Sequence, residues 1–121
     1  MLTETVLHFD KGEITDEQIK AHVQHYVNLA DEGMKHLNNN NRQEAMRCLK
    51  EIRKTMKEEY RYYDKLKVQK VMWKNEKYNM YYSFIRDAFV KQNTPNAYST
   101  LSSNLYDVWD YGLIHCSTFI K

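Results

Sequence analysis

The chain contains very little glycine and proline: three glycines and one proline occur in 121 residues. Tight turns and sheet connections use these two residue types, so their scarcity favours helices joined by short loops. The glycines are isolated at positions 12, 33 and 112, which excludes a glycine-rich phosphate loop. Serine-elbow and HExxH motifs are also missing, so we do not expect an enzyme.

Cysteines and long apolar runs are equally scarce. Cys48 and Cys116 are far apart in the sequence and match no metal or redox spacing, which favours a reducing compartment. No apolar run approaches the roughly 18 residues that read as a membrane span. Residues 1–12, with an acid at Glu4, do not resemble a secretory signal. We therefore expect a cytoplasmic protein with no membrane partner.

The composition is that of a soluble globular protein, with 42% hydrophobic and 28% charged residues. The charge is unevenly placed. Residues 1–41 hold three basic and seven acidic residues, a net charge of −4, whereas residues 42–77 hold twelve and six, a net charge of +6. Such a basic middle can pair with the acidic first third or face an acidic partner.

The best-defined element is a helix that begins after Thr15. Thr15 and Gln18 are spaced as a capping box, in which each side chain bonds the backbone N–H of the other. Apolar residues then recur at steps of three and four, as on one face of a helix. They are Ile19, Val23, Tyr26, Ala30, Met34 and Leu37. The asparagines at 38–41 should end this helix, because their side chains compete with the backbone for hydrogen bonds.

A second helix is predicted from residue 42, with Asn41 as its N-cap. Its apolar residues have helical spacing. They are Ala45, Leu49, Ile52, Met56, Tyr60 and Tyr63. The apolar stripe of the next segment is rotated from this one by about 70°, and an unbroken helix over 42–92 would be about 75 Å long. We therefore expect a break near Asp64.

A third helix is predicted over about 68–91. Its apolar stripe has the same kind of spacing. The members are Val68, Val71, Tyr78, Tyr82, Ile85 and Phe89. From Tyr78 to Val90 this segment is apolar almost all round, which is typical of a helix in the centre of a bundle or in an oligomer interface. A homo-oligomer is therefore left open.

A fourth helix is predicted from Pro95 to about His115, with Thr94 as its cap, because proline is favoured at the first helical position. Its apolar stripe is Ala97, Leu101, Leu105, Val108 and Gly112. Near the N-terminus, residues 4–9 alternate weakly and predict a short strand or an extended arm. The predicted fold is thus all-α: a compact bundle of four to five helices with a short extended N-terminal arm, in a single domain over residues 1–121.

One face of the second helix carries a row of cations nearly opposite its apolar stripe. They are Arg47, Lys50, Lys54, Lys57, Arg61 and Lys65. Such a row can follow a phosphate backbone or an acidic groove. The alternative is an ordinary solvated face, because Glu44, Glu51 and Glu58 each stand three residues before a cation and can pair with it.

Residues 60–84 combine six tyrosines and a tryptophan with many cations. Core packing is the plainest interpretation of these aromatics as a group, followed by protein contact and stacking on nucleic-acid bases. Tyr62 and Tyr81 fall outside the apolar stripes and, with Trp73, are the predicted exposed anchors. A second row of lysines adjoins them, with only Glu76 near in the sequence. These lysines are Lys67, Lys70, Lys74 and Lys77.

The first helix contains two residue pairs with the spacing of metal ligands on one helical face. The pairs are His22 with His25, and Glu32 with His36. The gap of about 10 Å between them is too wide for one ion, so each pair would need ligands from elsewhere, such as His115 or Cys116. Because such pairs occur often by chance, we expect ordinary surface histidines, with no metal and no cofactor.

These features favour binding over catalysis. We expect a small non-catalytic helical module that docks, as an adaptor or inhibitor, on a larger protein with an acidic surface. The expected contacts are Tyr62, Trp73, Tyr81, Lys67, Lys70, Lys74 and Lys77. Frequent lysine, asparagine and tyrosine suit a low-GC bacterial or phage genome, which is compatible with an inhibitor of a host complex.

The alternative is a weakly specific RNA- or DNA-binding protein that uses its basic helix faces. Its predicted phosphate contacts on the second helix are Arg47, Lys50, Lys54, Lys57 and Arg61. Lysine outnumbers arginine by thirteen to five. Because bidentate recognition of phosphate and guanine prefers arginine, this ratio argues for contact through charge alone.

Overall fold

The computed structural model describes residue 7 and residues 14–66, 76–93 and 100–116. These residues form α1 (Asp16–Asn38), α2 (Arg42–Leu66), α4 (Glu76–Asn93) and α5 (Leu101–His115). No strand occurs among them, and the predicted all-α bundle is confirmed for this part of the chain. Leu7 is buried in the core. The other residues of the predicted N-terminal arm lie outside the described ranges.

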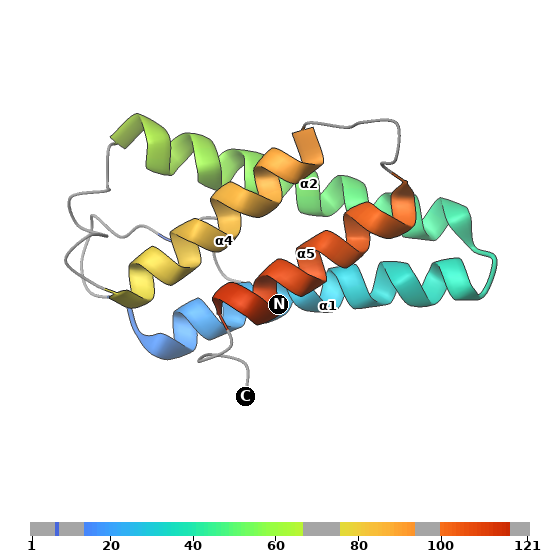
Figure 1. The fold of residues 1–121 in the computed structure, drawn as a ribbon, viewed down its shortest axis with the longest axis horizontal. Helices are drawn as coiled ribbons and strands as arrows, with labels where there is room; N and C mark the ends of the chain where they lie inside the picture. The colour runs from blue at the N-terminus through green and yellow to red at the C-terminus, as the bar shows by residue number, and fades with distance from the viewer. Residues whose placement is uncertain (1–6, 8–13, 67–75, 94–99, 117–121) are drawn as a thin grey trace.

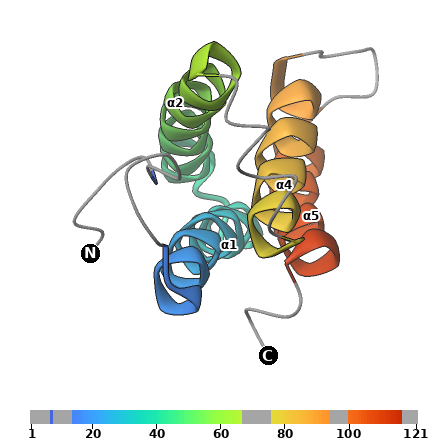
Figure 2. The ribbon, with the colours of Figure 1, turned by 90° about the vertical axis from the view of Figure 1, so that its left-hand side faces the viewer.

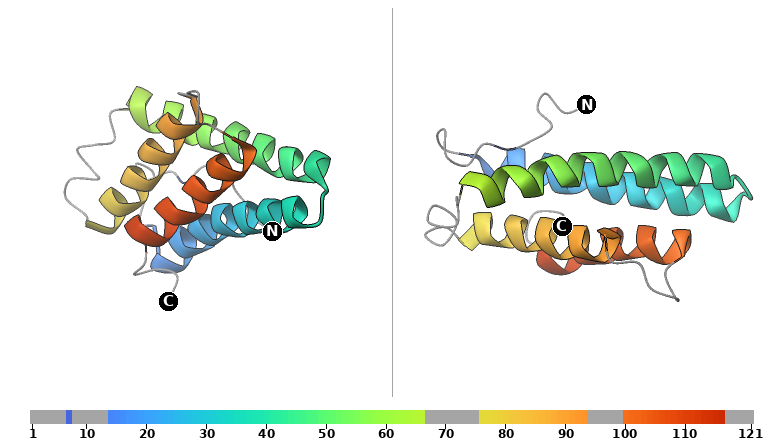
Figure 3. Two further views of the ribbon diagram at one scale, coloured as in Figure 1. Left: turned by 45° about the vertical axis from the view of Figure 1, so that its right-hand side comes forward. Right: turned by 90° about the horizontal axis from the view of Figure 1, so that it is seen from above.

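The helices are arranged in two layers. The antiparallel pair α1 and α2 forms one layer, and the antiparallel pair α4 and α5 forms the other and crosses the first diagonally (Figures 1 and 3). Figure 2 shows the two pairs facing each other in a view along the bundle. All four helices contribute to the hydrophobic core, which includes Val23, Ile52, Phe84 and Leu105. The core therefore lies between the layers, and the outer faces of the helices are open to solvent.

Helix α1 begins and ends where the sequence predicts. The Thr15 side chain accepts a hydrogen bond from the Gln18 N–H (3.2 Å), and the Gln18 side chain accepts one from the Thr15 N–H (2.8 Å). After Asn38 the chain turns through Asn40, whose φ of 60° is left-handed. Asparagine adopts this conformation more readily than most residues, which explains why the asparagine run ends the helix.

Helix α2 also begins as predicted, since the Asn41 side chain accepts a hydrogen bond from the Glu44 N–H (3.4 Å). It ends at Leu66, close to the predicted break at Asp64. The predicted apolar stripe is wrong at one position: Tyr60 is half-buried, and Glu59 is fully buried in its place. Most of the buried residues of α2 follow one another at alternating steps of four and three, and position 59 continues that alternation after Met56. This spacing places them on one seam, the line of residues that faces the other helices.

Helix α4 buries the predicted residues Tyr78 and Ile85, but the rest of its buried face differs from the predicted stripe. Tyr81 is fully buried, whereas Tyr82 and Phe89 are half-buried. The buried seam is Tyr78, Tyr81, Phe84, Ile85 and Ala88. Because this segment is apolar almost all round, its periodicity did not distinguish the two faces. Residues 68–75, the first part of the predicted third helix, lie outside the described ranges.

Helix α5 begins at Leu101, so the prediction of a continuous helix from Pro95 is wrong. Thr100 is extended (φ −125°, ψ 165°) and caps the helix by accepting a hydrogen bond from the Ser103 N–H (3.0 Å). The prediction that Thr94 and Pro95 start a helix falls outside the described residues. The predicted stripe from position 101 onward is confirmed. Its buried members are Leu101, Leu105, Val108 and Gly112.

Gly112 marks a close approach of α5 to α1. A Cβ atom at this position would lie 2.6 Å from Val27 Cγ2, and a valine in a helix is held in one strongly preferred rotamer. We expect Gly112→Ala to destabilise the protein by about 1–2 kcal/mol net, because overpacking outweighs the helix propensity that alanine gains. Urea denaturation followed by circular dichroism measures the change.

Gly33→Ala is the matched control in α1. Its Cβ would lie 3.3 Å from Cys48 Cβ, and it would meet the two terminal methyl groups of Leu105 at 2.8 and 2.9 Å. These methyls end a flexible side chain that can rotate away, so we expect a smaller loss than at Gly112. A Gly112→Ala protein as stable as Gly33→Ala would contradict the close packing against Val27.

Candidate functional site

The outer face of α2 forms an open groove with a volume of about 490 Å3, completed by one residue from α4. Five cationic residues, Glu58 and Phe89 line it. The cations are Lys50, Arg53, Lys54, Lys57 and Arg61. We call this surface the cation groove. A second hollow of about 500 Å3, lined in part by Glu44, Met46 and Arg47, continues it toward the start of α2 and shares Lys50 with it.

Most of the predicted cation row is not neutralised by its own helix. Arg47 pairs with Glu44 (Nη2 to Oε2, 2.7 Å), and the hydrogen bond that Arg47 donates to that carboxylate raises the pKa of Arg47. The pairs expected from Glu51 and Glu58 are not formed. Among the described residues, no carboxylate oxygen lies within 4.0 Å of four of the cations. They are Lys50, Lys54, Lys57 and Arg61.

Phe89 gives the cation groove an apolar wall. Its ring stacks on Tyr60 of α2, with centroids 4.8 Å apart and planes inclined by 14°. Phe89 itself is half-buried, so part of its side chain faces the groove while the rest packs on the bundle. The groove thus combines positive charge with a fixed aromatic surface.

Three of the predicted aromatic and lysine contacts lie among the described residues: Tyr62, Lys77 and Tyr81. Tyr81 is fully buried, and the prediction that it is an exposed anchor is wrong. Tyr62 is half-buried with its ring edge-on to Tyr63, at a centroid distance of 5.8 Å. Lys77 pairs with Asp16 of α1 (2.6 Å). The remaining predicted contacts lie outside the described residues: Lys67, Lys70, Trp73 and Lys74.

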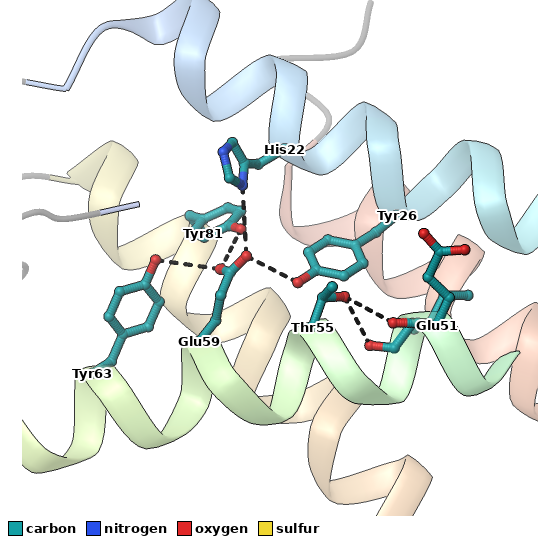
Figure 4. Close-up of polar contacts among 8 residues, drawn as sticks. His22, Tyr26, Glu51, Thr55, Glu59, Tyr63 and Tyr81 are labelled. Carbon is teal, nitrogen blue, oxygen red and sulfur yellow. Dashed lines mark hydrogen bonds and ion pairs between the residues drawn. The ribbon is translucent and has the colours of Figure 1, made fainter. Parts of the chain in front are cut away.

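Tyr81 is buried because it belongs to a polar cluster around Glu59, in the centre of the bundle (Figure 4). Glu59 Oε1 accepts a hydrogen bond from the Tyr26 hydroxyl (2.9 Å). Glu59 Oε2 accepts bonds from the hydroxyls of Tyr63 (3.3 Å) and Tyr81. Because α1, α2 and α4 each supply a partner, the buried carboxylate joins both layers. We call these four residues the Glu59 cluster.

Burial shapes the chemistry of the Glu59 cluster. It raises the pKa of Tyr26, Tyr63 and Tyr81 well above the usual tyrosine value, and the neighbouring Glu59 carboxylate raises it further. The three phenols therefore stay protonated and act as donors. The cluster connects α1, α2 and α4 through hydrogen bonds to one carboxylate, and none of its members lines the cation groove or the second hollow.

His22 lies next to the Glu59 cluster and is only 4% exposed, so the prediction of a surface histidine is wrong at this position. Its Nδ1 atom is 3.6 Å from Glu59 Oε1 and has no hydrogen-bond partner among the described residues. The sequence placed His22 beside the core stripe. Tyr81 of α4 lies edge-on to His22, with ring centroids 6.3 Å apart, so the second layer covers α1 at this position.

His115 and Cys116, the additional ligands suggested for the two residue pairs of α1, have other contacts. His115 Nε2 lies 3.0 Å from an oxygen of Asp87. Cys116 points toward the Met80 carbonyl (3.8 Å), and burial raises the pKa of its thiol to about 12. Within the described residues, a group with metal-ligand geometry comes instead from α1 and α2. It consists of Glu32, His36 and Cys48, whose ligand atoms all lie within 4.8 Å of one another.

None of the described helices combines the length and the apolar character needed to cross a membrane. Comparison of the chain with protein-family models, curated proteins and solved structures gave no match.

Proposed function

We propose that the protein is a non-catalytic helical module that binds an acidic segment of another protein in the cation groove, as an adaptor or an inhibitor of a larger complex. The observation that carries the proposal is the set of four exposed cations on α2 that have no carboxylate partner among the described residues. Solvated cations on a helix normally gain from i, i+3 and i, i+4 pairs. Here Glu51 and Glu58 are present at that spacing without pairing, so the charge remains available to a partner.

The walls of the groove favour protein over nucleic acid. Glu58 lines the cation groove and Glu44 lines the second hollow. A phosphate backbone is negative throughout and would be repelled at both points, whereas a protein segment can place a lysine or a hydrogen-bond donor there. Phe89 adds an apolar contact suited to one side chain of an amphipathic acidic helix. The proposal keeps the cytoplasm as the compartment, in line with two cysteines that are free thiols.

Weakly specific nucleic-acid binding is the second candidate, and the same unpaired cations support it. Arg61 lies eleven residues after Lys50, which corresponds to about 16 Å of helix. A single strand could lay several phosphates along that length. This candidate makes a distinct prediction, because each neutralised phosphate contributes about −0.7 to the slope of log affinity against log salt.

Reversing two charges in the groove should remove partner binding. We expect the double variant Lys54→Glu, Lys57→Glu to lose affinity for its protein partner by about 10–100-fold or more, because like charges then face the acidic segment. Wild-type and variant proteins are immobilised side by side and used to capture proteins from native lysate. The partner is the protein that the wild type retains and the variant does not. Direct titration of that purified partner by fluorescence anisotropy then gives the ratio.

Lys20→Glu is the matched control, since Lys20 is exposed on α1 and does not line the groove. The Lys20→Glu protein should capture the partner as well as the wild type does. Equal recovery of every captured protein by the wild type and the double variant would contradict the proposal.

The second candidate is tested with a labelled single-stranded oligonucleotide, titrated from about 50 mM salt upward, through the slope of log affinity against log salt.

A further inference from the structure

The region where α1 and α2 approach each other near their connecting turn brings three side chains with strong metal-ligand chemistry together. Glu32 and His36 are one helical turn apart on α1, and their nearest atoms, Oε1 and Nε2, are 3.7 Å apart. Residues at i and i+4 share one helical face. The pair therefore already points two different donor atoms, an oxygen and a nitrogen, at the same place.

Cys48 of α2 adds a sulfur donor to that place. Gly33 explains the approach: a Cβ at this position would lie only 3.3 Å from Cys48 Cβ, so the absence of a side chain lets α2 come close to α1. The thiol is free. The ligand atoms of Glu32, His36 and Cys48 all lie within 4.8 Å of one another, although the sequence places Cys48 twelve residues beyond His36.

We propose that Glu32, His36 and Cys48 bind one divalent transition-metal ion of the zinc type. Thiolate sulfur, imidazole nitrogen and carboxylate oxygen are the donors that Zn2+ takes in proteins. With bonds of about 2.0–2.3 Å, tetrahedral ligand atoms stand about 3.3–3.8 Å apart. The Glu32–His36 separation of 3.7 Å is already in that range. A rotation of the exposed Glu32 side chain and a small shift at Cys48 complete the arrangement.

The three protein ligands leave the fourth tetrahedral position to solvent or to an external ligand. The Glu32 side chain is 55% exposed, whereas the His36 side chain is 28% exposed, so the ion would be reached from the outer face of α1. Binding requires the thiolate form of Cys48, and one thiol proton is released to solvent for each ion bound. The ion would thereby link the two helices of one layer beside their connecting turn.

Cobalt(II) tests the site, because it takes the geometry of zinc and reports a thiolate ligand through a charge-transfer absorption band. Protein purified without a histidine tag and kept reduced is titrated with cobalt, and the cobalt is then displaced with zinc. We expect one equivalent of cobalt, a thiolate band, and loss of that band in Cys48→Ala. His36→Gln and Glu32→Gln should each weaken zinc binding by about 10-fold or more.

Two matched variants separate this site from other ligands in the chain. Cys116→Ala removes the other cysteine, and His25→Gln removes another histidine of α1. Both should keep the cobalt band. A band that survives in Cys48→Ala, or the absence of any band in the wild type, would overturn the proposal.

A second measurement keeps the test valid if Cys48→Ala unfolds. In the Cys116→Ala background, Cys48 is the only thiol. Zinc should slow its alkylation by at least about 10-fold, because the sulfur lone pair is then held by the ion. An alkylation rate that zinc leaves unchanged would equally overturn the site.

Discussion

Replacing Glu59 with alanine is expected to lower the free energy of unfolding by about 3–5 kcal/mol, the range for breaking a buried charged network by removing one partner. The carboxylate is fully buried and accepts hydrogen bonds from Tyr26, Tyr63 and Tyr81. Its removal takes away the carboxylate that accepts from three hydroxyls in the core, and each buried group that stays unsatisfied costs about 1–3 kcal/mol. The loss is a large part of the total stability of a domain of this size. Urea denaturation measures it.

The adjacent residue provides the control. Glu58 is exposed at the surface of α2, and Glu58→Ala should change stability by no more than about 0.5 kcal/mol. Glu59→Gln keeps one acceptor oxygen and nearly the same volume, so its loss should fall between the two alanine variants. Equal stabilities of Glu58→Ala and Glu59→Ala would show that the buried hydrogen bonds contribute nothing.

Alkaline pH should unfold the protein steeply through the same three tyrosines. Their pKa values are raised in the folded state by burial and by Glu59. A group with a raised folded pKa stabilises the fold below its unfolded pKa, and the stabilisation is lost as the pH rises above that value. Each such tyrosine removes about 1.4 kcal/mol per pH unit above about pH 10, so the three together remove about 4 kcal/mol per unit.

The comparison with Tyr81→Phe isolates the effect. This variant has one buried phenol fewer, so its free energy of unfolding should fall less steeply above about pH 10, by about 1.4 kcal/mol per pH unit. Urea titrations at a series of alkaline pH values give both slopes, and circular dichroism should show the helices lost as the buried tyrosinates form. Identical slopes for the two proteins would mean that Tyr81 ionises without unfolding.

Helix positions followed from the sequence where local chemistry determines them. The capping box of Thr15 and Gln18 and the asparagine turn fixed both ends of α1, because these side chains act on neighbouring backbone groups. The start of α5 was missed. Pro95 is a good first helical residue, but Thr100 with Ser103 forms an equally good capping box five residues later. Local signals that compete cannot be ranked without the rest of the fold.

Buried faces were harder to predict where polar and apolar residues exchange places. Glu59 occupies the seam position between Met56 and Tyr63, and the regular alternation of steps was the available signal. An apolar pattern favours Tyr60 over its charged neighbour at this position. The burial of Glu59 depends on the hydroxyls of Tyr26 and Tyr81, which come from two other helices. No pattern within α2 contains that information.

The cation groove also combines features that one helix determines with features that depend on another helix. The cation row on α2 was visible in the spacing of Lys50, Lys54 and Lys57, because helical geometry alone places them on one face. The contribution of Phe89 to the groove was not visible, since it arrives from α4. Spacing predicts that Glu44, Glu51 and Glu58 each pair with a cation, but only the Glu44 pair forms among the described residues, because spacing shows which charges can meet and not which of them do.

A buried carboxylate also limits how the helices can slide along one another. Moving α2 by one turn, about 5.4 Å, would bring another apolar residue to most seam positions at small cost. The same movement would carry Glu59 beyond reach of the Tyr26 and Tyr81 hydroxyls and leave its charge in an apolar surrounding, at a cost of several kcal/mol. Alternative alignments of the bundle are therefore penalised by a single side chain, and we expect the sequence to select one axial alignment.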